Sequence, residues 1–366
     1  MAGMKATFDY GKSNNIHFNP KGFEATVGSI SDDLKIPVSA GLSSSSALVV
    51  ASAIVSMKIW DLNIPKALLA KTCAKYERLV GMEGGGMDQA IAVFGEKGKA
   101  LLVDFSHPII ITNQVLLPDC VSLVIAHCGI EKEKANTNEY NMRVAECRLA
   151  CALIYYCNDL EMKTTCPKLA DLQIELHYLN PSQFLQEELK KLKKILPDFE
   201  DGKSLNYFKK LIKKNNLEAL IPSNLKDVLD EIQFKPVQRF IHVLEEASRV
   251  VTFSNICKII KKNGSIEQAK ILGDLMNQSH ESCSKVYECS LPELDELTEI
   301  CRKNGALGSR LTGAGWGGCT VSMIKENDSD NFIRNVTRDY YSKKGIQTPK
   351  IFLTKPNDGA VIYKFC

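Results

Sequence analysis

The sequence predicts a two-domain protein of the α+β or α/β class. A length of 366 residues, at about 150 residues per domain, suggests two domains. Apolar segments at 99–105 and 121–127 predict strands, and longer stretches with apolar residues at helical spacing predict helices. This mixture of helices, strands and loops is typical of mixed architectures rather than of all-α or all-β folds.

The N-terminal part begins with a polar, weakly patterned stretch at 1–35. Residues 36–60 change character sharply, because a short Gly/Ser loop runs into a small-residue apolar stretch without Gly or Pro. That pattern predicts a loop followed by a buried helix. Residues 65–80 predict a second helix, with Pro65 in its first turn.

The turn-rich stretch around Pro108 and Pro118 predicts a domain junction. We therefore place an N-terminal domain at 1–115 and a C-terminal domain at 116–366. The glycine-rich segment near 311–319 falls in the second of these domains.

Within the C-terminal part, residues 138–160 predict one helix and residues 266–304 predict two more. Residues 308–324 predict strand, glycine loop and strand. The Lys- and Leu-rich stretch at 161–235 fits either a helix that binds an anionic ligand or a membrane surface, or a solvated helix face. Acidic residues interleave with these lysines, so we favour the solvated face.

Composition limits the partners and the compartment. Hydrophobic residues make up 45% and charged residues 24%, which excludes disordered and collagen-like chains. A net charge of +3 predicts neither a nucleic-acid nor a membrane partner. The sequence shows neither a long apolar run nor the apolar core of a signal peptide. The thirteen cysteines are odd in number and form no Cys-x-x-Cys pair, which predicts reduced thiols in a cytoplasmic protein.

The first candidate site is the run from Gly41 to Ser46 before the apolar stretch. Glycine allows close backbone approach, serines supply hydroxyl donors, and a helix N-terminus attracts phosphate. A polar linker capped by serine is the competing interpretation. The abrupt change to apolar sequence favours a phosphate cradle, although no Walker A lysine follows.

The second candidate site pairs Glu77 with Asp88, eleven residues later across a glycine-rich loop. Two separated carboxylates can divide labour, one holding Mg²⁺ and the other deprotonating a hydroxyl. Spacing alone fits exposed acids in a glycine turn equally well. The third candidate is the glycine loop at 311–319, which suits either close approach to a ligand or a tight hairpin with a buried Trp316.

Taken together, these segments resemble the GHMP kinase superfamily and specifically its galactokinase branch. AGLSSSSAL is similar to the family's phosphate loop, GGGMDQA to the segment with its catalytic aspartate, and LTGAGWGGC to its C-terminal glycine motif. YERLVGMEGGGMDQ and NMRVAECRLA are most similar to N-acetylgalactosamine kinases. The resemblance covers roughly residues 20–366, with patchy similarity between 160 and 240.

The resemblance implies an α+β fold of two domains and ATP-dependent phosphorylation of the anomeric hydroxyl of galactose or N-acetylgalactosamine. It implies Mg²⁺ as a second cofactor and sugar and ATP as small-molecule partners of a monomer. The implied roles are a catalytic base at Asp88, which also contacts the sugar, and metal ligands at Ser45 and Glu77. Further implied contacts are to phosphate at Gly41, Ser43, Ser44, Ser45 and Lys134, and to the sugar at Tyr140, Gly313 and Gly315.

Residues 1–36 lack the family's N-terminal run Arg-Val-Asn-hydrophobic-Ile-Gly-Glu-His-x-Asp-Tyr, which carries most sugar contacts. We therefore expect a truncated N-terminal domain with an open sheet edge and an exposed core. Two alternatives to a kinase follow: a regulator that binds sugar and ATP without turnover, and an inactive truncated product. The intact serine loop weighs modestly against the regulator. The sequence does not separate galactose from N-acetylgalactosamine.

Overall fold

The computed structural model describes residues 1–28, 42–80, 84–105, 111–131, 138–214, 216–260 and 263–363. Contacts between residues divide the chain into two compact units. Unit 1 comprises 1–133, 256–277 and 290–366, and unit 2 comprises 134–255 and 278–289. The boundary predicted between residues 115 and 116 stays a prediction.

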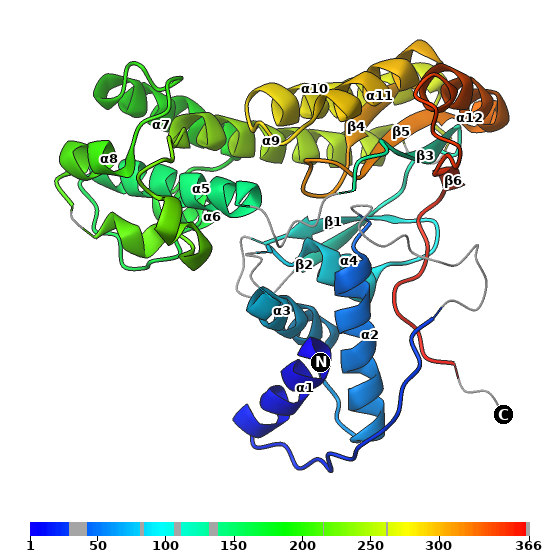
Figure 1. Ribbon diagram of the computed structural model, residues 1–366, viewed down its shortest axis with the longest axis horizontal. Helices are drawn as coiled ribbons and strands as arrows, with labels where there is room; N and C mark the ends of the chain where they lie inside the picture. Colours follow the sequence, from blue (N-terminus) through cyan, green and yellow to red (C-terminus); the bar gives the residue numbers. More distant parts are fainter. Residues whose placement is uncertain are drawn as a thin grey trace. The chain divides into compact units, whose positions relative to one another are not determined.

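The first part of unit 1 is a group of helices beside a two-stranded antiparallel sheet (Figure 1). Its helices are α1 (Ala2–Ser13), α2 (Ser44–Ile59), α3 (Lys66–Glu77) and α4 (Met87–Phe94). A 3₁₀ turn (Arg78–Val80) extends α3. The strands are β1 (Ala100–Asp104) and β2 (Ile111–Val115), with Ala100 opposite Val115.

Apolar side chains at helical spacing form the core of this group. Val50 and Ala53 of α2, Leu69 and Cys73 of α3 and Val93 of α4 are buried together. Their spacing of three or four residues within each helix places them on one face.

Helix α1 packs very closely on α2. A Cβ atom on Gly3 would lie 2.1 Å from the carbonyl oxygen of Val49 and 2.2 Å from Oγ of Ser52. Further along α1, Phe8 meets Trp60 edge-on, with ring centroids 6.2 Å apart. Glycine at position 3 is therefore what allows the two helix backbones to approach.

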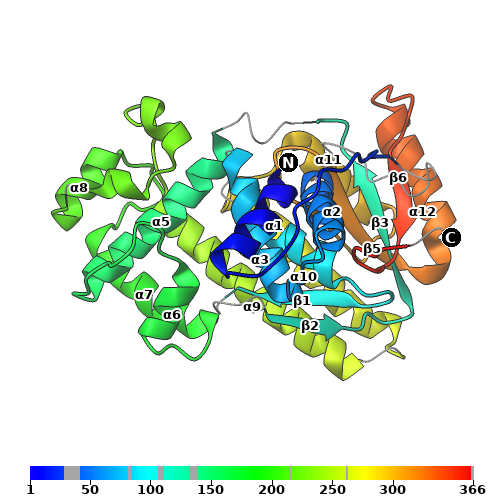
Figure 2. The same cartoon turned by 90° about the horizontal axis from the view of Figure 1, so that it is seen from below.

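The second part of unit 1 is a four-stranded antiparallel sheet in the order β4-β5-β3-β6. Its strands are β3 (Val121–His127), β4 (Gly308–Leu311), β5 (Cys319–Lys325) and β6 (Ile351–Thr354). Helices α11 (Pro292–Lys303) and α12 (Ser329–Val336) pack against it, and α12 continues into a π-helical turn (Thr337–Ser342) (Figure 2).

Two buried tyrosines of the π-helical turn fix the end of β3. The hydroxyl of Tyr341 donates to the carbonyl oxygen of His127 (2.8 Å), and that of Tyr340 donates to the carbonyl of Cys128 (2.7 Å). Burial raises the pKa of both phenols, so both stay protonated donors at neutral pH. The chain that leaves β3 toward the glycine loop is thereby held in place.

Unit 2 is helical. Its helices are α5 (Glu139–Cys157), α6 (Leu169–Glu175), α7 (Pro181–Ile195) and α8 (Leu205–Ile212), with 3₁₀ turns at Leu217–Leu220 and Ser223–Val228. Helices α9 (Pro236–Ile260) and α10 (Ile266–Lys285) contribute residues to both units. Leu149 and Leu153 of α5 are buried with Phe184 of α7 and Phe240 of α9.

The predicted α+β class is confirmed, because the helices occur together with sheets whose strand pairs are antiparallel. The strands predicted at 99–105 and 121–127, the helix at 138–160 and the strand–loop–strand at 308–324 all form, within one to three residues at most ends. Several elements were not predicted: α1, in the stretch taken as weakly patterned, β2, in the stretch taken as a junction, and also α4, α9, α12 and β6.

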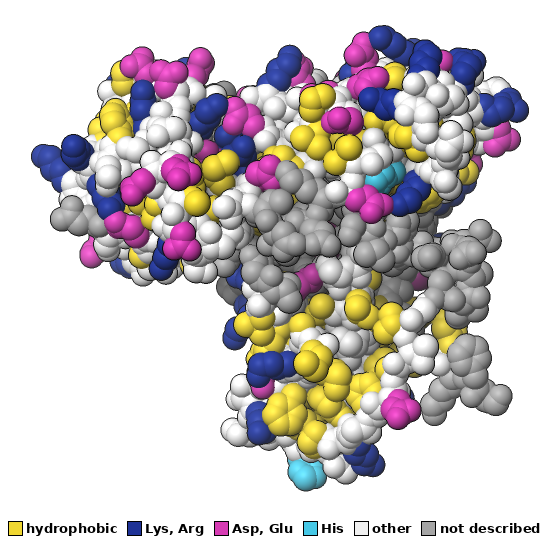
Figure 3. Space-filling model, viewed as in Figure 1, with side chains coloured by type: hydrophobic (Ala, Val, Ile, Leu, Met, Phe, Trp, Pro, Cys, Tyr) yellow, Lys and Arg dark blue, Asp and Glu magenta, His cyan; other side chains and the backbone are white. Residues whose placement is uncertain are grey.

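Helix α2 was expected to be buried, and this expectation was wrong for one of its faces. Leu48 and Val55 are 48% and 39% exposed, and Met87 and Ile91 of the neighbouring α4 are exposed as well. Figure 3 shows hydrophobic side chains gathered over α1 and α2. An exposed apolar face of this kind favours association.

Among the residues that the structure describes, no helix combines the length and the apolar character needed to cross a bilayer. The cysteines of the described part are free thiols, and eight of them are buried. The prediction of unpaired cysteines is therefore confirmed for these residues.

Candidate active site

The N-terminus of α2 presents unpaired backbone N–H groups. The first helical hydrogen bond joins the N–H of Ala47 to the carbonyl of Ser43 (3.0 Å), so the N–H groups of Ser44, Ser45 and Ser46 precede the helical ladder. Ser43 has the left-handed φ of +61° and leads into right-handed helix. A left-handed residue followed by right-handed residues turns successive backbone N–H groups toward one point, where an anion can bind.

A carboxylate lies directly beside these serines. Glu77, the last residue of α3, accepts a hydrogen bond on Oε1 from Oγ of Ser45 (2.8 Å) and one on Oε2 from Oγ of Ser46 (2.8 Å). Nε2 of Gln89 on α4 donates to Oε2 of Glu77 and to Oγ of Ser46 (3.1 Å). Three helices thus meet at one carboxyl group, which we call the Glu77 cluster: Ser45, Ser46, Glu77 and Gln89.

Asp88 lies in the first turn of α4, directly before Gln89 of the cluster. Gly86 precedes this helix with a left-handed φ of +97°, which glycine adopts without strain. The Asp88 side chain is half-buried, so its carboxylate remains accessible. A carboxylate at a helix N-terminus is also favoured by the helix dipole.

The neighbours of Glu77 on α3 are fixed by other contacts. The hydroxyl of Tyr76 donates to Oδ2 of Asp9 on α1 (2.5 Å), which ties α1 to the end of α3. Burial and this hydrogen bond raise the pKa of Tyr76 to about 12. Burial, followed by the charge of Glu77, raises the pKa of Cys73 to about 12, so no thiolate competes at the site.

The glycine loop between β4 and β5 has left-handed φ values at Gly313 (+75°) and Gly315 (+89°). Trp316 is buried, as the hairpin interpretation expected. Next to it, Gly317 has a φ of +125°, and a Cβ there would lie 2.8 Å from the carbonyl oxygen of Ile130. Backbone approach to the segment after β3 therefore requires glycine at position 317.

The serine turn and the sheet that carries the glycine loop touch through Leu42. This residue, directly before Ser43, packs against Ile125 of β3 and Cys319 of β5. Cys319 follows the glycine loop directly and stands opposite His127. The end of the sheet that bears the glycine loop therefore lies next to the N-terminus of α2.

Three of the residues implied by the resemblance are not placed with this group. Gly41 and Lys134 lie outside the described residues. Tyr140 lies in the first turn of α5 and belongs to unit 2, whereas the Glu77 cluster and Asp88 belong to unit 1. Ser45 and Glu77, which the resemblance implies as metal ligands, are joined in the structure by a hydrogen bond.

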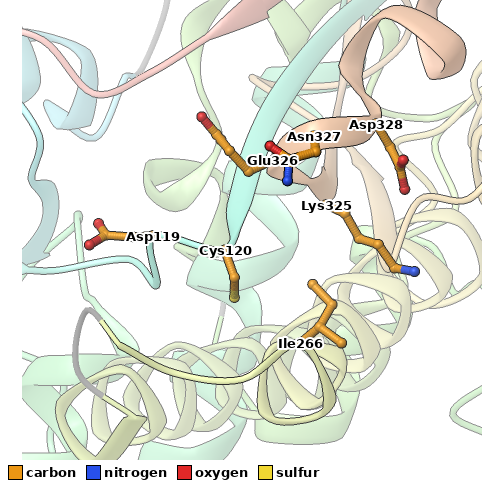
Figure 4. Close-up of a pocket in the computed structure, with 7 residues that line it drawn as sticks. All are labelled: Asp119, Cys120, Ile266, Lys325, Glu326, Asn327 and Asp328. Carbon is orange, nitrogen blue, oxygen red and sulfur yellow. The ribbon is translucent and has the colours of Figure 1, made fainter.

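A cavity of about 580 Å³ lies elsewhere on unit 1 (Figure 4). It is lined by Asp119, Cys120, Ile266, Lys325, Glu326, Asn327 and Asp328. Val121 pairs with Lys325 at this end of the sheet and His127 with Cys319 at the other, so about 20 Å of strand separates the cavity from the glycine loop. Glu326 already pairs with Lys355 (2.7 Å), and the cavity is not part of the site described above.

Sequence reasoning assigned no role to Ser46 and Gln89 of the Glu77 cluster, although Ser46 closes the first candidate run. Both are nearly buried, at 3% and 6% exposure, although both are polar. Both also lie inside the quoted segments AGLSSSSAL and GGGMDQA. The available signal was a polar residue on the apolar face of a helix. Such a residue becomes buried, and buried polar groups require partners.

Two family models match the chain. The N-terminal domain of GHMP kinases matches residues 10–96, which hold the Glu77 cluster and Asp88. The C-terminal domain of GHMP kinases matches residues 256–343, which hold the glycine loop.

Proteins similar to this chain include several galactokinases. A galactokinase of Dictyostelium discoideum is 38% identical over 351 residues, covering 89% of this chain and 68% of the relative. A galactokinase of Saccharomyces cerevisiae is 29% identical, covering 90% and 69%. The crystal structure of Lactococcus lactis galactokinase complexed with galactose superposes with a TM-score of 0.61 at 24% identity, covering 88% and 68%, and so shows the same fold. With both domain models in order and a relative at this identity, the chain belongs to the GHMP kinase superfamily, in its galactokinase branch of ATP-dependent sugar kinases.

Proposed function

We propose that this chain transfers the γ-phosphoryl group of ATP to the anomeric hydroxyl of galactose or N-acetylgalactosamine. The observation that carries the proposal is the Glu77 cluster, which joins the phosphate-facing helix α2 to the helix that bears Asp88. The names of the relatives favour galactose, and the similarity of YERLVGMEGGGMDQ to N-acetylgalactosamine kinases favours the second sugar.

The residues present fit Mg²⁺. Oγ of Ser45 and Oε1 of Glu77 are hard oxygen donors 2.8 Å apart. Adjacent ligands of an octahedral Mg²⁺ with bonds of about 2.05 Å are separated by about 2.9 Å. No group of three or more His, Cys, Asp or Glu side chains within the described ranges could hold a metal, so phosphates and waters would complete the shell.

Each residue has one task in the proposed reaction. The N–H groups of Ser44, Ser45 and Ser46, with the αL turn at Ser43, hold the phosphates, and bound Mg²⁺ would neutralise their charge. Asp88 accepts the proton of the anomeric hydroxyl as that oxygen bonds to the γ-phosphorus and the bond to the β–γ bridging oxygen breaks. ADP carries away the electron pair of the broken bond.

Gly41 and Lys134 are proposed as further nucleotide contacts, and Tyr140, Gly313 and Gly315 as sugar contacts. We also propose that the chain acts as a cytoplasmic monomer. The even charge balance and the free cysteines support that setting.

The direct test is sugar-dependent ADP release by the purified chain, with the product identified by ³¹P NMR. We expect ADP release with galactose or N-acetylgalactosamine and a sugar 1-phosphate product. Comparing kcat/KM for the two sugars assigns the substrate. ADP release that is equal with and without sugar would contradict the proposal.

A regulator that binds sugar and ATP without turnover is the second candidate. Saturable nucleotide and sugar binding without any ADP release would favour this candidate over the kinase.

Replacing Ser45 by alanine is expected to raise the Mg²⁺ concentration for half-maximal activity about tenfold or more, because one proposed metal ligand is lost. Ser45 is exposed, so Tm should change by no more than about 2 °C. Ser52→Ala on the same helix is the matched control, since the hydroxyl of Ser52 bonds to the carbonyl of Val49 within α2. Equal losses of activity and of Tm in Ser45→Ala would contradict the ligand role.

A further inference from the structure

The side chain of Gln89 is the least expected member of the Glu77 cluster. It is polar, yet 6% exposed, and it comes from the helix that bears Asp88. Its amide Nε2 donates both to Oγ of Ser46 (3.1 Å) and to Oε2 of Glu77. A buried amide that reaches two groups on two other helices fixes all three elements relative to one another.

The two carboxylate oxygens of Glu77 accept hydrogen bonds from donors that differ in exposure. Oε2 accepts hydrogen bonds from two nearly buried donors, Ser46 and Gln89. Oε1 accepts from Ser45, which is exposed. One carboxylate oxygen is therefore engaged by two nearly buried donors, and the other lies on the exposed side.

We propose that Gln89, together with Ser46, is a positioning residue that holds Oε2 of Glu77 and leaves Oε1 to bind the divalent cation of the nucleotide. The inference rests on the proposed function for the identity of that cation. Oriented partners of a metal ligand set its direction and its affinity, and their loss typically costs 10–100-fold in metal binding.

The same contact orients Asp88. Neighbouring residues on an α-helix point about 100° apart, so fixing Gln89 toward α2 and α3 also fixes the direction of Asp88. One side chain thus fixes the orientation of both the metal-facing carboxylate and the proposed base.

An amide suits this role better than a charged group. It donates to Glu77 without cancelling the negative charge that a cation needs. A lysine would neutralise that charge, and a glutamate would place a like charge beside Oε2.

The test is the affinity of the folded protein for Mn²⁺ in the presence of ADP, measured by electron paramagnetic resonance. Gln89→Met keeps the length of the side chain and removes the donor. We expect the Mn²⁺ dissociation constant to rise about tenfold or more in this variant, while metal-free ADP binding stays within about twofold. Ser46→Ala removes one of the two donors to Oε2 and should give a smaller rise.

Gln114→Met is the matched control. Nε2 of Gln114 also donates to a carboxylate, Oε1 of Glu96 (2.5 Å), but at an exposed position on β2. Its Mn²⁺ affinity should equal that of the wild type. Thermal unfolding of each variant separates a folding defect from a metal effect, and Ser46→Ala decides the question if Gln89→Met does not fold.

The outcomes separate this inference from the proposed function. Wild-type affinity for Mn²⁺ in both folded variants, or in Ser46→Ala alone if Gln89→Met does not fold, would overturn the inference. A wild-type chain that binds Mn²⁺ with ADP, but releases no ADP from ATP and sugar, would contradict the proposed kinase activity and leave the role of Gln89 standing. A wild-type chain that does not bind Mn²⁺ with ADP would overturn both.

Discussion

Replacing Asp88 by asparagine is expected to lower kcat for sugar phosphorylation by about 10²–10⁴-fold. The amide has nearly the same shape as the carboxylate but does not accept the proton of the anomeric hydroxyl. Because the base acts in the transition state, the KM for ATP should change little. Initial-rate kinetics at saturating sugar and Mg²⁺ measure the effect.

The cost of Asp88→Asn to folding should be small. Asp88 lies in the first turn of α4, where its charge interacts favourably with the helix dipole, and the loss should lower Tm by no more than about 4 °C. Binding of Mn²⁺ with ADP should stay at the wild-type level, since the Glu77 cluster is intact.

Helix α12 supplies the matched control for Asp88. It is also eight residues long, and Asp330 is likewise its second residue. Asp330→Asn should therefore lower Tm by a similar amount and leave kcat unchanged. A drop in kcat of less than about tenfold in Asp88→Asn would contradict its role as the base, because general base catalysis supplies at least about a hundredfold.

The sequence predicted those elements whose patterns are local. Strands β1, β3 and β5 are apolar runs bounded by turns, and α11 begins with proline at its first position. Each of these signals lies within the element itself, so a single sequence is enough to read it.

Two of the missed elements, α1 and β2, depend on contacts with distant residues. Helix α1 contains two glycines, which weaken helical propensity, but Gly3 is needed for the close approach to Val49 of α2. Strand β2 has the mixed sequence ITNQV and is defined by its pairing with β1. Tertiary context overrides local preference at both places.

The candidate site shows the same limit. Ser45 and Glu77 are 32 residues apart, and spacing alone left their pairing open. Motif resemblance supplied that pair, because a family motif carries information on distant contacts. The partners Ser46 and Gln89 were missed although they lie inside those motifs, since a motif match alone does not tell which side chains touch.

The largest expected effect on stability lies in unit 2, at a buried group of charges. Glu146 of α5 is 1% exposed and accepts hydrogen bonds from Nη1 of Arg143 (2.8 Å) and Nε of Arg239 (2.8 Å). The backbone N–H of Lys235 donates to its other oxygen (2.8 Å). Burial by itself would lower the pKa of Arg239. The charges and hydrogen bonds of Glu146 and, to a smaller extent, of Glu288 outweigh burial, so the pKa of Arg239 is raised.

Replacing Glu146 by glutamine is therefore expected to lower the free energy of unfolding by about 3–5 kcal/mol, because two buried guanidinium groups lose their shared countercharge. Urea unfolding followed by circular dichroism measures the loss. Hydrogen exchange should place the faster-exchanging amides in α5 and α9, the helices that carry Glu146 and Arg239.

Glu267→Gln is the control, because Glu267 pairs with Lys270 on the exposed face of α10 and such pairs contribute little to stability. Glu288 offers Arg239 a second carboxylate at 2.6 Å, but it is 36% exposed and stands 3.7 Å from Arg143. A loss below about 1 kcal/mol in Glu146→Gln would mean that Glu288 alone compensates both arginines, contrary to the usual cost of an unpaired buried charge. Because Tyr140, a proposed sugar contact, lies three residues before Arg143 on α5, we expect a loosened network also to raise the KM for sugar more than the KM for ATP.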